Sequence, residues 1–349
     1  MRLQGGAMAR WGGLILLSGL FAYGLEVLHL PAAPLLGPMA AAIVLAISGK
    51  GVVLPGATMA LAQGLVGLMI ATILPAAMLG EMAAKWPLVV AGTMSTILAS
   101  AGLGWMLARS AILPGTTAIW GSAPGAATVM TVIAGDYGAD IRLVAFMQYL
   151  RVAVVAVSST LVAHGFGRKV GAAPQVDWFP AISAPALAGT VALAAALAFV
   201  GIKARVPGGS FLVPMIAGLG LVHTGWTLTL PPWLLALTYA SIGWTIGLRF
   251  TPAILTHAAR AFPRVFGTIL LLMAICGVAA LLLVKFAGVD PLTAYLATSP
   301  GGADSVAIIS ASTPVDVPFV MTMQMARFLL VLFTGPWLAR ALSGASPKT

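Results

Sequence analysis

The sequence predicts an all-α polytopic membrane protein made of two inverted repeats, each with about five transmembrane helices and one broken or re-entrant helix. Three features predict this fold: long apolar blocks, an internal duplication and the distribution of basic residues. Of the 349 residues, 60% are hydrophobic and 7% are charged, whereas a soluble domain carries roughly 25% charged residues. We therefore expect the lipid bilayer to surround most of the chain.

The apolar residues form twelve blocks, six in each half of the chain. Most of them have about the 20 residues that a helix needs to cross the hydrocarbon layer. The blocks cover residues 11–30, 33–48, 57–80, 87–108, 115–134, 141–163, 179–201, 209–224, 233–250, 263–287, 291–311 and 316–340.

An offset of 176 positions aligns residues 1–175 with residues 176–349 almost without gaps. Low complexity would match Ala and Leu at any offset, but this one also matches Pro, Gly, Asp, Gln and Arg. The matched pairs include Pro38 with Pro214, Gly49 with Gly225, Gly67 with Gly243, Pro124-Gly125 with Pro300-Gly301, Asp140 with Asp316, Gln148 with Gln324 and Arg151 with Arg327. The two halves are therefore predicted to be membrane repeats that form one intertwined membrane domain.

The basic residues indicate the relative orientation of the repeats. If every block crosses the membrane, the basic residues divide almost evenly between its two sides. If blocks 115–134 and 291–311 fold back instead, one side collects Arg2, Arg10, Lys50, Arg109, Arg142, Lys203, Arg205, Arg249, Arg260, Arg264, Arg340 and Lys348, against Lys85, Arg168, Lys169 and Lys285. Cytoplasmic loops show such a bias, which favours ten crossings, inverted repeats and two cytoplasmic termini.

The two blocks that are predicted to fold back carry the candidate site. Pro124 and Pro300 remove a backbone donor and disfavour helix at Ala123 and Ser299. Interrupted backbone within a bilayer is tolerated where it is buried in protein or lines a cavity, and a helix that begins after the break would direct N–H groups toward an anion. The candidate substrate-binding residues around the breaks are Ser122, Pro124, Gly125, Thr128, Ser299, Pro300, Gly301, Asp304 and Ser305. Close helix packing is the alternative explanation for such residues, but their repetition in one register favours a site.

Arg151 and Arg327 lie within apolar blocks, where a charged side chain normally faces a partner or a cavity. Gln148 and Gln324 precede them by three residues and therefore share their helix faces. Each pair could bind an anionic substrate or donate to free carbonyl groups of the broken helix. Snorkelling to the membrane surface, or a structural pairing with an acidic residue, remains an alternative.

Acidic residues near the breaks allow two interpretations. Asp304 has Thr128 as its counterpart, so this acid is unique to the second repeat and could bind a coupling ion, a proton or sodium. Helix capping is the alternative role for Asp304, and capping is the favoured role of Asp140 and Asp316 at the starts of the last blocks.

Several functional classes are not supported by the sequence. The four histidines and the single cysteine are scattered without metal-ligand spacing, so we expect no metal, no cofactor and no catalytic residues. The net charge of +10 comes without a basic face that has interleaved aromatic residues, so no nucleic-acid partner is expected.

The segments SAPGAATVM and GDYGADIRLVAFMQYLRV, together with SPGGADSVAII and STPVDVPFVMTMQMARF, resemble the membrane AbrB family. The resemblance extends over nearly the whole chain. It implies an internally duplicated protein of the bacterial inner membrane, and it assigns the family motifs to Pro124, Gly125, Pro300, Gly301, Gln148, Arg151, Gln324 and Arg327. Members carry labels of gene regulator or ammonia monooxygenase, and their architecture resembles that of cation/anion antiporters and symporters.

Taken together, the sequence favours a secondary transporter or exporter of a small, anionic organic solute, and not an enzyme. A membrane sensor that regulates gene expression through a partner is the alternative, and an ammonia monooxygenase is a third. A homodimer is left open.

Overall fold

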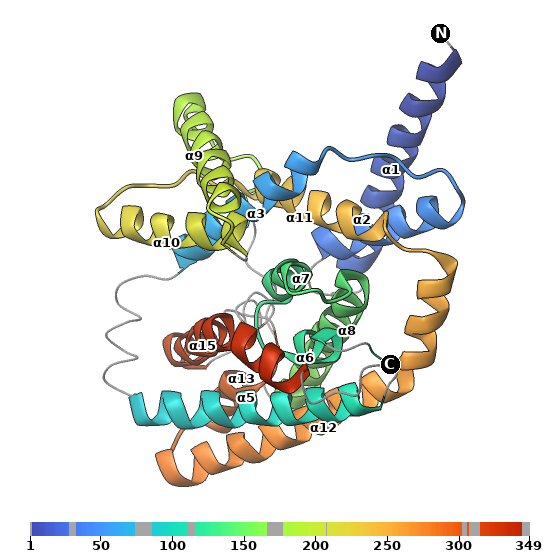
Figure 1. The fold of residues 1–349 in the computed structure, drawn as a ribbon. Coiled ribbons are helices and arrows are strands. Elements are labelled where there is room, and N and C mark those ends of the chain that lie inside the picture. The colour runs from blue at the N-terminus through green and yellow to red at the C-terminus, as the bar shows by residue number, and fades with distance from the viewer. Residues whose placement is uncertain are drawn as a thin grey trace. The chain divides into compact units, whose positions relative to one another are not determined.

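A computed structural model gives the fold of the chain (Figure 1). It describes residues 2–27, 33–73, 86–110, 113, 116–165, 177–206, 208–301, 306 and 315–343.

The described residues form an all-α protein, in agreement with the prediction from sequence. Six of the helices are long and apolar enough to cross a membrane, among the residues that the structure describes. The helices are α1 (Arg2–Val27), α2 (Ala33–Ile47), α3 (Gly56–Ile73), α5 (Trp86–Arg109), α6 (Thr116–Ser122), α7 (Ala127–Asp136), α8 (Ile141–Gly165), α9 (Ala184–Lys203), α10 (Gly209–His223), α11 (Pro232–Gly247), α12 (Pro252–Ala287), α13 (Pro291–Thr298) and α15 (Val317–Ser343).

The duplication is visible in the way that corresponding helices end. Helix α2 is followed by Gly49, with φ of 70°, and α10 is followed by Gly225, with φ of 85°. The N–H of Lys50 donates to the carbonyl of Leu45 at 2.9 Å, and the N–H of Trp226 donates to that of Leu221 at 3.1 Å. Both ends are Schellman motifs, in which a left-handed glycine lets the chain turn back onto the last carbonyls. All of these residues differ by 176 positions between the repeats.

The chain divides into two compact units that do not coincide with the repeats. Unit 1 contains residues 1–75 and 176–256, and unit 2 contains residues 76–175 and 257–349. Each unit therefore combines corresponding parts of both repeats, and each is described separately below.

In unit 1, helices of one repeat pack closely against helices of the other repeat. A Cβ atom on Gly67 of α3 would lie 2.5 Å from the carbonyl oxygen of Phe211 in α10. A Cβ atom on Gly243 of α11 would lie 2.5 Å from the carbonyl oxygen of Leu35 in α2. A glycine is needed at both positions because another helix backbone occupies the space of a side chain. Each repeat thus contributes one helix to a close contact with the other, in matching register.

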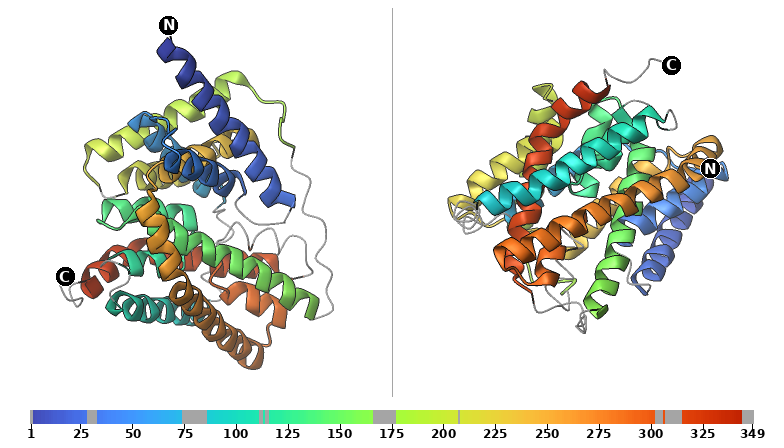
Figure 2. Two further views of the ribbon diagram at one scale, coloured as in Figure 1. Left: turned by 90° about the vertical axis from the view of Figure 1, so that its right-hand side faces the viewer. Right: turned by 90° about the horizontal axis from the view of Figure 1, so that it is seen from below.

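Unit 2 contains the interrupted helices. Helices α5 and α12 lie side by side in Figure 1 and in the view from below in Figure 2, and Leu103 packs with Leu272 and Cys276 between them. A larger apolar cluster joins α13 to α15, with Leu292, Leu296 and Phe319 among its buried members.

Two predicted boundaries were wrong. Helix α12 begins at Pro252 and not at residue 263, and α1 begins at Arg2 and not at residue 11. The start of α12 follows from local chemistry: the side chain of Thr251 accepts from the N–H of Ile254 at 3.4 Å, and proline suits the first helical position. Pro263 is accommodated inside this helix.

Whether the repeats are inverted across a membrane stays a prediction.

Candidate functional site

Both repeats have an interruption in the helix that contains the Pro-Gly motif. Helix α6 ends at Ser122 and α7 begins at Ala127, so Ala123 to Ala126 form the first break. Helix α13 ends at Thr298, and Ser299 to Gly301 begin the second break. The breaks lie where the two prolines predict them. At the end of each short helix, backbone carbonyl groups have no partner within the helix.

The first Gln/Arg pair donates to the carbonyl groups at the end of α6. Nε2 of Gln148 donates to the carbonyl oxygens of Trp120 at 2.7 Å and Ala123 at 3.0 Å. In Arg151, Nη1 donates to Ala123 at 2.7 Å and Nη2 donates to Gly125 at 3.2 Å. Nη2 of Arg151 also donates to Oε1 of Gln148 at 2.6 Å, which links the pair.

The second pair repeats this arrangement at positions 176 residues later. Nε2 of Gln324 donates to the carbonyl oxygens of Leu296 at 2.8 Å and Ser299 at 3.3 Å. In Arg327, Nη1 donates to Ser299 at 2.7 Å and Nη2 donates to Gly301 at 3.0 Å. Nη2 of Arg327 also donates to Oε1 of Gln324. Of the interpretations left open by the sequence, donation to free carbonyl groups is therefore the one seen in the hydrogen bonds.

One hydrogen bond joins the two repeats. Nε of Arg327 donates to the carbonyl oxygen of Pro124 in the first break at 2.9 Å. Arg151 donates to the carbonyl oxygens of the residues on either side, Ala123 and Gly125. Three consecutive carbonyl groups of the first break thus receive hydrogen bonds from two guanidinium groups, which come from different repeats.

These arginines concentrate positive charge inside unit 2. Arg151 and Arg327 are only 1% and 2% exposed. Among the described residues, no carboxylate lies within 4 Å of either guanidinium. The carbonyl ends of α6 and α13 carry partial negative charge, which favours a cation beside them. Carbonyl dipoles supply only part of a counter-charge to these two guanidinium groups.

The acidic residues next to the site act at helix starts. Oδ1 of Asp140 accepts from the N–H of Arg142 at 3.0 Å, and Oδ1 of Asp316 accepts from the N–H of Phe319 at 3.0 Å. Burial raises the pKa of Asp140, but the hydrogen bond and ion pair with Arg142 at 2.7 Å outweigh burial and hold the pKa below its usual value. Asp304 and Ser305 lie outside the described residues.

The remaining predicted polar residues differ in their contacts. Oγ1 of Thr128 lies 3.1 Å from the hydroxyl of Tyr149. Oγ of Ser299 donates to the carbonyl oxygen of Leu296 at 3.1 Å. Oγ of Ser122 is buried and has no hydrogen-bond partner, although the carbonyl oxygen of this residue accepts from Oγ of Ser100.

Ser100, Thr93 and Thr96 of α5 were not among the residues predicted from the sequence. All three are at most 2% exposed. Their spacing of three and four residues places them on one face of α5. A polar face at helical spacing within an apolar block was the signal that could have revealed them.

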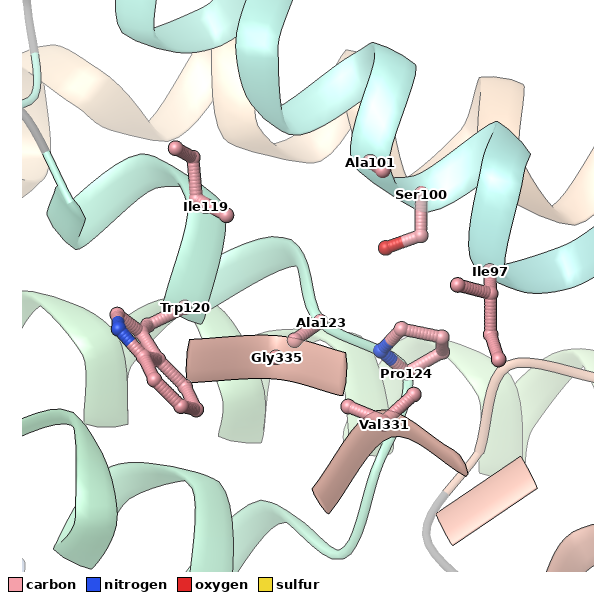
Figure 3. Close-up of a pocket in the computed structure, with 9 residues that line it drawn as sticks. All are labelled: Ile97, Ser100, Ala101, Ile119, Trp120, Ala123, Pro124, Val331 and Gly335. Carbon is pink, nitrogen blue, oxygen red and sulfur yellow. The ribbon is translucent and has the colours of Figure 1, made fainter. Parts of the chain in front are cut away.

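Two small cavities flank the first break within unit 2. Figure 3 shows one of about 20 Å³ between α5, α6 and α15, with Ser100, Trp120, Pro124 and Val331 on its walls. The indole Nε1 of Trp120 is buried without a hydrogen-bond partner.

The other cavity, also of about 20 Å³, is lined by Ser122, Arg151 and Thr268 together with apolar side chains. Oγ of Ser122 and Nε of Arg151 are both buried without a hydrogen-bond partner. A cavity of this size has room for about one water-sized group. The described residues contain no group of three or more His, Cys, Asp or Glu side chains that could hold a metal ion.

Comparison with known proteins gives a consistent family match. Residues 34–343 match the family model described as "Transition state regulatory protein AbrB". The chain is 46% identical over 343 residues to a protein of Escherichia coli (strain K12) named "Putative regulator AbrB", an alignment that covers 97% of this chain and 98% of the relative. It is 25% identical over 303 residues to "Uncharacterized protein YhjN" of Bacillus subtilis (strain 168), with 81% and 78% covered.

Proposed function

The chain belongs to the AbrB family, and we propose that it is a secondary transporter or exporter of small anionic organic solutes in the bacterial inner membrane. The observation that carries the proposal is the pair of interrupted helices, whose free carbonyl groups are held by two buried arginines. Discontinuous helices at matching points of two repeats are typical of binding sites in secondary transporters.

The arrangement of charge supports an anionic solute. Two buried guanidinium groups beside interrupted backbone are costly in a bilayer unless they have a function or a counter-charge. A solute carboxylate would supply that charge when it binds. In the proposed cycle, the bundle that carries the broken helices moves against the rest of the chain and exposes the solute to each side in turn. A proton or sodium gradient would drive the movement.

The experiment is flux into proteoliposomes that contain the purified full-length protein. A panel of radiolabelled organic acids would be tested with and without proton and sodium gradients. Arg151→Lys keeps the charge but loses the planar fork of donors, so transport should fall by about tenfold or more. Arg260→Gln, which removes an exposed arginine, is the matched control and should transport normally. Equal flux through protein-free liposomes or through the Arg151→Lys variant would refute the proposal.

The name of the Escherichia coli relative favours a second candidate, a membrane regulator that acts through a partner. The two functions can be separated in cells that lack the gene. If the Arg151→Lys protein restores normal transcription but not flux, the chain acts as a regulator. If both are lost together, the change in transcription follows from the transported solute.

A further inference from the structure

The two halves of the site are not equivalent in their unused hydrogen-bond donors. In the first repeat, Nε of Arg151 and Oγ of Ser122 are buried without partners. In the second, the corresponding Nε of Arg327 donates to Pro124, and Oγ1 of Thr298, the counterpart of Ser122, donates to Ala294 at 2.9 Å. The second repeat thus serves as an internal reference, in which the same two positions have partners.

The two residues that carry these unpartnered donors line the same small cavity. Ser122 and Arg151 both line it, and the remaining walls are mainly apolar, with Leu103, Met147 and Ile269 among them. Arg151 is 1% exposed and Ser122 is 8% exposed. A buried charged donor without a partner is costly, so the cavity has a strong preference for a group that accepts hydrogen bonds.

We propose that this cavity binds one small monovalent anion, with Nε of Arg151 and Oγ of Ser122 as its donors. The inference rests on the proposed function for the identity of the solute, and it deepens that function by locating where a single anionic group is held. The anion is either a free halide or the carboxylate head of an organic acid. These two share the same chemistry, a compact negative charge that accepts two hydrogen bonds.

The positive charge around the cavity and the small volume of the cavity favour a small anion over a water molecule as its occupant. Among the residues that the structure describes, no acidic side chain lines the cavity, and the nearby Arg327 adds a second positive charge that donates to the same break. A neutral water would accept the two hydrogen bonds but would leave both charges uncompensated. The volume of about 20 Å³ excludes the body of an organic acid, which would have to extend along the break.

The test is direct binding to the full-length protein in nanodiscs of phosphatidylcholine. Thermal unfolding would be followed while sodium gluconate is replaced by sodium bromide or sodium formate at constant ionic strength. An anion that binds the folded protein raises the unfolding temperature, and above its Kd the gain in stability grows with the logarithm of the anion concentration. Bromide stabilisation alone identifies a free halide site, and formate stabilisation identifies the site of a carboxylate head; either result supports the proposal.

Variants of Ser122 test whether the stabilisation by an anion comes from this cavity. Ser122→Ala removes one donor to the anion and should weaken binding about tenfold, the factor expected for a hydrogen bond to a charged group. Ser122→Val fills the cavity as well and should abolish binding. Thr322→Val is the matched control, because Oγ1 of Thr322 is equally buried and unpartnered but does not line this cavity.

No stabilisation by either anion, or unchanged stabilisation in both Ser122 variants, would overturn the proposal. Because thermal unfolding is measured without transport, the result tests the anion site separately from the proposed transport function. Transport without binding at this cavity would overturn the anion site alone. Binding without transport of any solute would overturn the transporter alone.

Discussion

The two buried arginines should differ in their contribution to stability, although they occupy matching positions. Among the described residues, Arg327→Leu leaves the carbonyl oxygens of Pro124 and Gly301 without a donor. Arg151→Leu leaves only that of Gly125.

The other carbonyl groups at the breaks keep a second donor. The carbonyl of Ala123 retains Nε2 of Gln148, and that of Ser299 retains Nε2 of Gln324. The carbonyl of Ser122 also accepts from Nη1 of Arg151 at 3.4 Å, and in Arg151→Leu it retains Oγ of Ser100 as a donor. Removal of a buried charge and insertion of Leu are common to both variants and cancel in the comparison. The difference is one buried carbonyl group without a partner, which costs about 1–3 kcal/mol.

We therefore expect Arg327→Leu to be less stable than Arg151→Leu by about 2 kcal/mol, or roughly 30-fold in the ratio of folded to unfolded protein. The free energy of unfolding would be measured in mixed micelles by titration with dodecyl sulfate and followed by circular dichroism. Gln148→Leu and Gln324→Leu lose equivalent bonds and should agree within about 0.5 kcal/mol. Equal destabilisation by the two arginine variants, or a larger effect of Arg151→Leu, would refute the reasoning.

Three further changes have defined outcomes. Gly243→Ala places a Cβ atom 2.5 Å from a backbone carbonyl oxygen of α2 and should lower the unfolding free energy by about 2 kcal/mol, whereas Gly102→Ala, with no atom within 4 Å, should have little effect. Asp140→Asn removes the ion pair with Arg142 and should cost about 1 kcal/mol at pH 7. Because the pKa of Asp140 is lowered in the folded protein, this difference should be present above its ordinary value of 3.8 and shrink as the pH falls further. Asp304→Asn should make solute flux insensitive to the proton or sodium gradient in proteoliposomes, and unchanged gradient dependence would remove that residue from the coupling mechanism.

Local chemistry explains which parts of the fold were predictable. Pro124 and Pro300 disrupt the helix through their own covalent structure, so the positions of both breaks follow from the sequence. The spacing of Gln148 and Arg151 places the two side chains on one face by helix geometry alone. The apolar block begins only at residue 263, whereas α12 itself begins at Pro252, where Thr251 accepts from the N–H of Ile254.

Long-range pairing was not predictable in the same way. Gly67 and Gly243 match each other in sequence, yet each packs against a helix of the opposite repeat. Nothing in an apolar block of Ala, Leu and Gly specifies which other block it contacts, because many such surfaces are equally complementary. The bond from Arg327 to Pro124 spans 203 positions and has the same origin. A duplication shows which residues are equivalent, but not which copy supplies the partner.

The two guanidinium groups differ in which of their nitrogens have hydrogen-bond partners. This difference decides which substitution best tests for a bound ligand. Each nitrogen of Arg327 donates to the protein, while Arg151 uses Nη1 and Nη2 for the first break and leaves Nε unused. Any substitution of Arg151 therefore alters the backbone of the break as well as the cavity. Ser122 differs, because its main-chain carbonyl accepts from Oγ of Ser100, whereas its own hydroxyl has no hydrogen-bond partner. A change confined to that hydroxyl leaves the break intact, so an effect of Ser122→Ala on anion binding can be assigned to the cavity itself.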